Sequence, residues 1–348
     1  MVLSLVRAFP HAPLYTSLYD PTGTFPEFGA VDVRTSSLNL VRPLRQRHRL
    51  ALPLLAPAFS RVRIAAEVAI CSSSGWAHGA RVDGRKVVYC HAPARWLYQT
   101  SRYLGNAGPI PRAALAALRA PLERWDRKGA ASANRYLANS SWIALEIRRI
   151  YGIEADVVHP PVAIDADGPR RPPSRIEPGY VLCVSRLLPY KNVGAIVAAF
   201  TELPGERLVV VGEGPEEAQL HAIAPRNVHF AGPVADEELR WLYDHASCLV
   251  AASYEDFGLT PIEAAAFGKP TAALRFGGYL DTVREDETGV LFERPEPIAI
   301  AVAVRAVLDR SWDATAIRQH AGAFSEERFT RRVREVAEEE LVLGGRLP

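Results

Sequence analysis

The second half of the chain alternates short apolar runs with helical patterns, and this alternation constrains the fold more than any other feature. Each run is nearly free of polar residues, which is typical of a strand buried on both faces. Such strands, separated by helices, predict a parallel sheet with helices on both sides. The expected strands are 180–184, 207–211, 228–230, 248–252 and 271–274, and the expected helices are 192–200, 215–221, 236–245 and a segment from Pro261.

The first half shows a similar α/β pattern, with strands expected at 68–72, 87–90, 136–139 and 156–159 and a helix at 142–151. Between the halves, residues 165–178 are polar and rich in Pro and Arg, which is typical of an interdomain linker. We therefore expect two α/β domains, 1–164 and 179–325, in a chain of 348 residues. In open α/β sheets ligands bind at the carboxyl ends of the strands, and we expect a site there.

Composition disfavours membrane-spanning and disulfide-rich proteins. No apolar run approaches the roughly 20 residues that a spanning helix needs. Residues 1–7 lack the features of a secretory signal, so we expect a cytoplasmic protein. The four cysteines form no CxxC pair, which indicates buried thiols rather than zinc ligands or disulfides. They are Cys71, Cys90, Cys183 and Cys248.

Charge is distributed unevenly along the chain. Residues 1–170 carry 22 Lys and Arg against 12 Asp and Glu, whereas residues 171–348 carry 19 against 27. A basic first half favours an anionic membrane face or a phosphate-bearing acceptor as partner, and plain solubility is the alternative. The basic cluster at 42–49 adjoins the apolar run 50–55, as in a segment that docks on acidic lipid. A solvated loop leading into a core helix is the other interpretation.

A glycine loop and a helix start follow the strand at 248–252. Thr260, Pro261 and Glu263 fit the N-cap, N1 and N3 positions of a capping box, which is one interpretation of Glu263. The other is functional, because a helix N-terminus presents free N–H groups to a diphosphate. The N–H groups expected here belong to Leu259, Thr260 and Ile262.

Glu255 and Glu263 stand eight residues apart on either side of this loop, where they are suited to hold a sugar hydroxyl and a ribose hydroxyl. Arg186 and Lys191 follow the strand at 180–184. Two cations at such a turn can neutralise a departing nucleotide diphosphate, work that a divalent metal does elsewhere. Taken singly, Arg186, Lys191 and Glu255 also fit ordinary solvated surface charges.

Two further glycine pairs carry weaker signals. Gly212 and Gly214 begin a dinucleotide-type pattern, but Glu217 stands where its third glycine belongs. Gly277 and Gly278 form either a ligand-binding loop or a plain turn.

Together these motifs resemble family 4 glycosyltransferases of the GT-B fold, which implies two Rossmann-like α/β domains facing across a cleft. The resemblance covers nearly the whole chain. Four segments of the first half look like the bacterial branch that builds O-antigen, capsule or exopolysaccharide, often with mannose. They are 12–16, 32–36, 88–93 and 138–141.

The resemblance also implies roles for individual residues. Arg186 and Lys191 would contact the donor diphosphate, and the backbone of Gly258, Leu259 and Thr260 would complete the phosphate site. Glu255 would lie beside the transferred sugar, and Glu263 would hold the ribose. His91, in Tyr-Cys-His-Ala-Pro, matches a histidine of the first domain that faces the sugar. By its chemistry alone His91 also fits a satisfied histidine at a strand end.

The activity implied is retaining, metal-independent hexosyl transfer from a nucleotide-sugar, with mannosyl transfer from GDP-mannose favoured and a UDP-sugar as second choice. The acceptor would be a saccharide or a lipid-linked saccharide in cell-surface polysaccharide synthesis. We expect a cytoplasmic enzyme, peripheral on the inner membrane face if the basic cluster docks there. No cofactor, metal or nucleic-acid partner is expected. The final segment, 326–348, resembles the helix that crosses back to the first domain in this fold.

One departure from the family pattern concerns the beginning of the chain. The family opens with a strand and a glycine-rich loop, whereas residues 1–10 look like the second half of the helix that follows them. We expect translation to start upstream.

Three functions are the alternatives to an active glycosyltransferase. They are a catalytically inactive nucleotide-binding or scaffold subunit, a nucleotide-sugar 2-epimerase, and a phosphorylase of the same fold.

Overall fold

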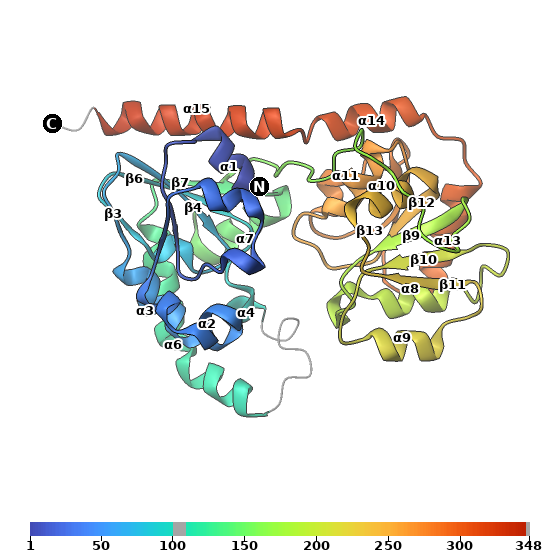
Figure 1. Cartoon of the computed structure of the whole chain (residues 1–348), viewed down its shortest axis with the longest axis horizontal. Helices are drawn as coiled ribbons and strands as arrows, with labels where there is room; N and C mark the ends of the chain where they lie inside the picture. Colours follow the sequence, from blue (N-terminus) through green and yellow to red (C-terminus); the bar gives the residue numbers. More distant parts are fainter. Residues whose placement is uncertain (100–108, 346–348) are drawn as a thin grey trace. The chain divides into compact units, whose positions relative to one another are not determined.

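The computed structural model describes residues 1–99 and 109–345, and its contacts divide the chain into two compact units (Figure 1). Unit 1 comprises Met1–Pro161 and Glu326–Pro348, and unit 2 comprises Val162–Ser325. Residues 165–178, expected as a linker, lie in unit 2. Their backbone contacts the helix at 236–245, since Arg171 N donates to Glu237 O at 3.1 Å and Arg240 Nε donates to Asp165 O at 2.9 Å.

Unit 2 is built on a six-stranded parallel sheet with the order β11-β10-β9-β12-β13-β14. The strands predicted from apolar runs are all present, and β14 was not predicted. Their bounds are β9 (Tyr180–Val184), β10 (Leu208–Val211), β11 (Val228–Gly232), β12 (Ala246–Ala251), β13 (Thr271–Leu274) and β14 (Gly289–Phe292). Nearly all side chains of the inner strands β9, β10, β12 and β13 are buried in one large apolar core, because helices cover both faces of the sheet, whereas the edge strands β11 and β14 are only partly buried.

Helices α8 and α9 lie on one side of this sheet, and α10 and α11 lie on the other (Figure 1). The segment α13 is a helix that the sequence pattern did not predict, and it packs against α8. The helices of unit 2 are α8 (Val193–Ala199), α9 (Glu217–Ile223), α10 (Asp236–His245), α11 (Leu259–Ala266), α12 (Tyr279–Thr282), α13 (Pro297–Leu308) and α14 (Ala314–Gly322), with a 3-10 turn at η6 (Pro189–Lys191).

Unit 1 contains a four-stranded parallel sheet of β4 (Val68–Ser73), β6 (Arg85–Cys90), β7 (Arg135–Ala138) and β8 (Asp156–Val157), in that order. Two smaller parallel pairs accompany it: β1 (Leu14–Thr16) with β2 (Val33–Thr35), and β3 (Arg63–Ile64) with β5 (Arg81–Val82). Its other helices are α1 (Val2–Ala8), α2 (Arg42–Gln46), α3 (Leu52–Arg61), α4 (Arg95–Tyr98), α6 (Pro109–Ala131) and α7 (Ser141–Tyr151).

Local signals explain the bounds of α7. The Ser140 hydroxyl accepts a hydrogen bond from Ile143 N at 3.1 Å, which caps the first turn. Gly152 ends the helix in the left-handed conformation, with φ 72°. The prediction of buried thiols is also confirmed, because the four cysteines, all within the described residues, are buried and form no disulfide. Among residues 1–99 and 109–345, none of the helices combines the length and apolar character needed to cross a membrane.

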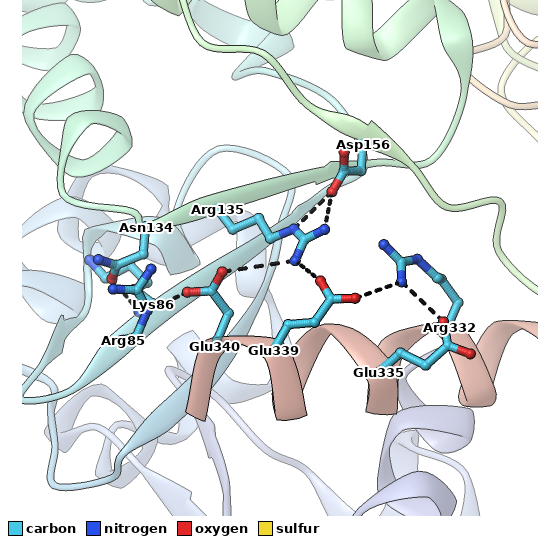
Figure 2. Close-up of polar contacts among 9 residues, drawn as sticks. All are labelled: Arg85, Lys86, Asn134, Arg135, Asp156, Arg332, Glu335, Glu339 and Glu340. Atoms are coloured by element: carbon cyan, nitrogen blue, oxygen red, sulfur yellow. Dashed lines mark hydrogen bonds and ion pairs between the residues drawn. The ribbon is translucent and has the colours of Figure 1, made fainter. Parts of the chain in front are cut away.

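The C-terminal helix α15 (Glu326–Gly344) packs on unit 1 through an apolar stripe. Phe329, Val333 and Val336 are buried against Tyr89 and Leu137 of the sheet. Charged groups extend this contact, as Figure 2 shows. Arg135 of β7 pairs with Asp156 at 2.6 Å and with Glu339, and Arg85 of β6 pairs with the buried carboxylate of Glu340. Arg332 bridges Glu335 and Glu339 on the helix itself.

Candidate functional site

The two central strands of the unit 2 sheet define the candidate site. From β9 the sheet extends through β10 and β11 on one side, whereas β12, β13 and β14 extend it on the other. The strand order therefore reverses between β9 and β12, which is where open α/β sheets bind ligands. The predicted donor residues lie on the loops that leave these strands, at 185–192 and 252–258, and on the helix that follows the second loop.

The side chains of Lys191 and Glu255 contact each other between the loops that follow β9 and β12. The Lys191 ammonium pairs with the Glu255 carboxylate, and only 12% and 19% of the two side chains are exposed. Asn192, with φ 55°, donates from its side-chain amide to Ala252 O at 2.8 Å. The Ser253 hydroxyl lies 3.4 Å from Lys191 O. These hydrogen bonds fix the two loops to each other, so the ion pair is held in a position largely shielded from solvent.

Tyr190 links the two predicted cations, and sequence reasoning missed it. Arg186 is exposed, and its guanidinium donates to the Tyr190 hydroxyl at 3.0 Å. The Lys191 ammonium lies 5.2 Å from the centre of the same ring, within cation–π range. Tyr254 N donates to Tyr190 O at 3.3 Å, which ties this residue to the second loop. The only available signal was the position of Tyr190 between Arg186 and Lys191.

The structure corrects the predicted start of α11. The helix begins at Leu259, two residues before Pro261, and Gly258 is its N-cap with φ 82°. A side chain at Gly258 would stand 2.5 Å from the Tyr279 ring, so both the conformation and the space require glycine. The prediction that Thr260 is the N-cap of a capping box is therefore wrong. Because Ile262 is now the fourth helical residue, its N–H belongs to the helix ladder, and the open N–H groups are those of Gly258, Leu259 and Thr260.

Glu263 has a partner that the sequence pattern did not suggest. Its carboxylate accepts a hydrogen bond from the hydroxyl of Tyr243, on α10, at 2.7 Å. Tyr243 is fully buried. Burial raises the pKa of Glu263, and the hydrogen bond from Tyr243 opposes that rise. Arg186 and Lys191 thus both contact Tyr190, and Lys191 pairs with Glu255, whereas Glu263 is bonded to Tyr243 of α10.

The glycine pairs bring backbone together around the site. A side chain at Gly212 would collide with Ser185 O, and one at Gly214 would collide with Leu187 O, so this turn packs directly on the loop that carries Arg186. A side chain at Gly278 would meet the backbone of Phe257. Close packing of loops therefore accounts for these glycines.

His91 lies in unit 1, directly after β6. Its imidazole Nε2 is 3.0 Å from the hydroxyl of Ser72, on β4, a neighbour that sequence reasoning missed. Burial lowers the pKa of His91 to about 4, so the ring is neutral at physiological pH.

A family model described as "Glycosyl transferases group 1" matches residues 169–323. Residues 169–323 are a glycosyl transferases group 1 domain. This domain contains every predicted donor residue of unit 2, and His91 lies outside it. The family match thus includes both loops of the candidate site.

Curated relatives match part of the chain. The D-inositol 3-phosphate glycosyltransferase of Acidothermus cellulolyticus is 33% identical over 218 residues, which cover 54% of this chain and 48% of that protein. The glycogen synthase of Mycobacterium tuberculosis is 36% identical over 151 residues, covering 40% of this chain and 36% of that protein. The chain thus spans about half the length, or less, of these relatives.

Solved structures resemble the chain over nearly its full length. The sucrose-phosphate synthase of Thermosynechococcus elongatus has a TM-score of 0.67 at 21% identity, covering 98% of this chain and 91% of that one. HepE of Anabaena, in complex with UDP, has a TM-score of 0.69 at 19% identity, covering 97% and 95%. At such identities the likeness concerns the fold. Together with the parallel sheets, it confirms the predicted α/β class and GT-B fold.

Proposed function

We propose that this chain is a retaining, metal-independent glycosyltransferase that moves a hexosyl group from a nucleoside-diphosphate sugar to a saccharide or lipid-linked saccharide. Its place would be cell-surface polysaccharide synthesis. The observation that carries the proposal is the contact of Lys191 with Glu255 and of Arg186 with Tyr190, at the point where the strand order reverses and on loops of which the second leads into α11. The family match over the same residues supports it.

The proposed chemistry stabilises a leaving diphosphate. The acceptor oxygen bonds to the anomeric carbon, the bond from that carbon to the diphosphate oxygen breaks, and the acceptor proton passes to a donor phosphate oxygen. Lys191, Arg186 and the N–H groups at the start of α11 would take up the negative charge that develops on the diphosphate. Glu255 would orient Lys191 and contact the transferred sugar, and Glu263 would hold the ribose. No protein nucleophile is required, which is consistent with retention.

For the donor, UDP-sugars and GDP-mannose are the first candidates. HepE has been solved with UDP and with UDP-glucose, which favours testing UDP-sugars first. Mannosyl transfer remains a prediction from the sequence. The test is incubation of purified protein with each nucleotide-sugar, followed by chromatography of the released nucleotide and of the sugar. Slow release of nucleoside diphosphate supports the proposal. Release of a free epimerised sugar would favour an epimerase, and no turnover with any donor would favour an inactive subunit.

We propose that the acceptor lies at an acidic membrane surface, and that the protein is cytoplasmic and binds this surface peripherally. The segment that was expected either to dock or to lead into a core helix has buried as well as exposed apolar side chains. Leu55 is buried in α3, whereas Leu40 is 86% exposed and Leu50 is 54% exposed. Arg42 and Arg47 are exposed between these two leucines. Exposed apolar side chains beside cations favour an interface with anionic lipid.

Sedimentation with vesicles tests this partner. We expect binding to phosphatidylglycerol vesicles, weaker binding to phosphatidylcholine vesicles, and loss of binding in Leu40→Ser and in Arg42→Glu. A matched control is Ile298→Ser on α13 of unit 2, since Ile298 is 72% exposed and lies far along the chain from the cluster. Equal binding by all variants, or no binding to anionic vesicles, would remove the membrane from the proposal.

A further inference from the structure

The backbone of His91 is fixed on both sides by its neighbours. Strands β4 and β6 pair in parallel with Ser72 opposite Tyr89, so Ser72 and His91 reach the same carboxyl edge of the sheet. His91 N donates to Ser73 O at 2.9 Å. His91 O accepts from the Asn139 side-chain amide at 3.0 Å. With the backbone held in this way, the remaining freedom of the residue is the rotation of its ring.

Ser72 restricts that rotation. Its hydroxyl lies 3.0 Å from Nε2 of the ring, and Tyr89 packs edge-on against the ring with centres 5.2 Å apart. Within the described residues, Nδ1 of His91 makes no hydrogen bond. One nitrogen is therefore held by Ser72, while the other has no hydrogen-bond partner among the described residues.

We infer that Ser72 is a positioning residue that orients His91 and leaves its Nδ1 to meet a hydroxyl of a saccharide bound at the carboxyl edge of this unit 1 sheet. In a neutral imidazole one nitrogen donates and the other accepts, so whichever role the Ser72 hydroxyl takes at Nε2, as donor or as acceptor, sets the role left to Nδ1. Without the hydroxyl of Ser72, the ring gains rotational freedom and exchanges between its tautomers. The inference rests on the proposed function for the role of His91, but the geometry of the pair can be tested without turnover.

Nitrogen NMR of protein labelled with ¹⁵N-histidine tests the pair directly. His91 is one of nine histidines, and its signals are those missing in His91→Gln. We expect two well-separated ring-nitrogen shifts in the wild type, as a single tautomer gives. We expect shifts drawn together by tautomer exchange in Ser72→Ala and restored separation in Ser72→Thr. A matched control is Ser74→Ala, which removes an exposed hydroxyl two residues away. Unchanged shifts in Ser72→Ala would overturn the inference.

Kinetics supply the functional readout. If His91 contacts the sugar, Ser72→Ala lowers kcat about tenfold, Ser72→Thr restores most of it, and Ser74→Ala has no effect. Turnover of Ser72→Ala equal to wild type would show that the orientation of His91 does not matter for transfer, and would also overturn the inference. Absence of activity in the wild type with every donor would instead contradict the proposed function, and the NMR comparison would still decide the role of Ser72.

Discussion

The ammonium of Lys191 and the carboxylate of Glu255 form an ion pair between the loops that follow β9 and β12, although 64 residues separate them in sequence. Both side chains are mostly buried, so solvent screens this pair less than an exposed one. Removing either partner leaves the other charge poorly solvated. The pair therefore holds a cation at the reversal of strand order, where the diphosphate is proposed to bind.

Replacing either member of this pair should impair catalysis more than folding. We expect Lys191→Ala and Glu255→Gln each to lower kcat about 100-fold, in the range seen when one group that stabilises developing charge is removed. Melting temperatures should change by only a few degrees. The control is Asp286→Asn, which breaks the exposed Arg310–Asp286 pair of the same unit. Near-normal turnover in Lys191→Ala or Glu255→Gln would contradict the proposed site.

The Tyr243 hydroxyl should matter for both stability and nucleotide binding. Tyr243→Phe leaves the Glu263 carboxylate without its buried donor, and we expect the free energy of unfolding in urea to fall by about 1–3 kcal/mol. Since that hydrogen bond lowers the pKa of Glu263, its loss should raise this pKa further. The matched control is Tyr180→Phe, which also removes a buried tyrosine hydroxyl with a hydrogen bond, because Tyr180 donates to Leu242 O at 2.8 Å. Only Tyr243→Phe should also weaken nucleotide binding, and equal affinity in both variants would argue against Glu263 as the ribose ligand.

Attachment of α15 to unit 1 should depend on one buried carboxylate. Glu340 has a side chain only 3% exposed, and Glu340→Ala removes the partner of Arg85. We expect a loss of about 1–3 kcal/mol in the free energy of unfolding, as for a charged hydrogen-bond partner left unsatisfied. Glu335→Ala, whose side chain is 47% exposed, should change stability by less than about 0.5 kcal/mol. Similar losses in both variants would show that burial does not distinguish the two contacts.

Protonation of His91 should lower the free energy of unfolding at acidic pH. Its pKa is about 4 in the folded protein and near 6.5 when unfolded, so below pH 6.5 the unfolded chain binds a proton that the folded chain does not. The free energy of unfolding should therefore drop as pH falls from 6.5 toward 4, by up to about 3 kcal/mol. Urea unfolding at pH 7 and pH 4.5 measures the drop, which should be smaller in His91→Gln. An equal drop in both proteins would place the titrating group elsewhere.

The main strands of both units could be predicted because most of them are local runs of apolar residues that must be buried, whereas β14 and the short strands β1, β2, β3 and β5 were missed. The donor loops could be placed as well, because parallel strands bring their carboxyl ends to one edge of a sheet. Thr260 failed as an N-cap because Gly258 starts the helix in a left-handed conformation that no capping pattern reveals.

Side-chain partners from distant elements could not be predicted. Tyr243 reaches Glu263 from another helix, and Ser72 reaches His91 from the neighbouring strand. Each contact depends on which faces of two elements meet, and this depends on packing rather than on local sequence.

Calorimetric titration of the wild-type chain with UDP and with GDP, in the presence of EDTA, tests most directly whether the loops after β9 and β12 form a diphosphate site. We expect one of the nucleotides to bind without metal, at least tenfold weaker binding in Lys191→Ala and in Arg186→Ala, and unchanged binding in Asp286→Asn. Binding that requires a divalent metal, or that is the same in Lys191→Ala as in the wild type, would contradict the proposed site.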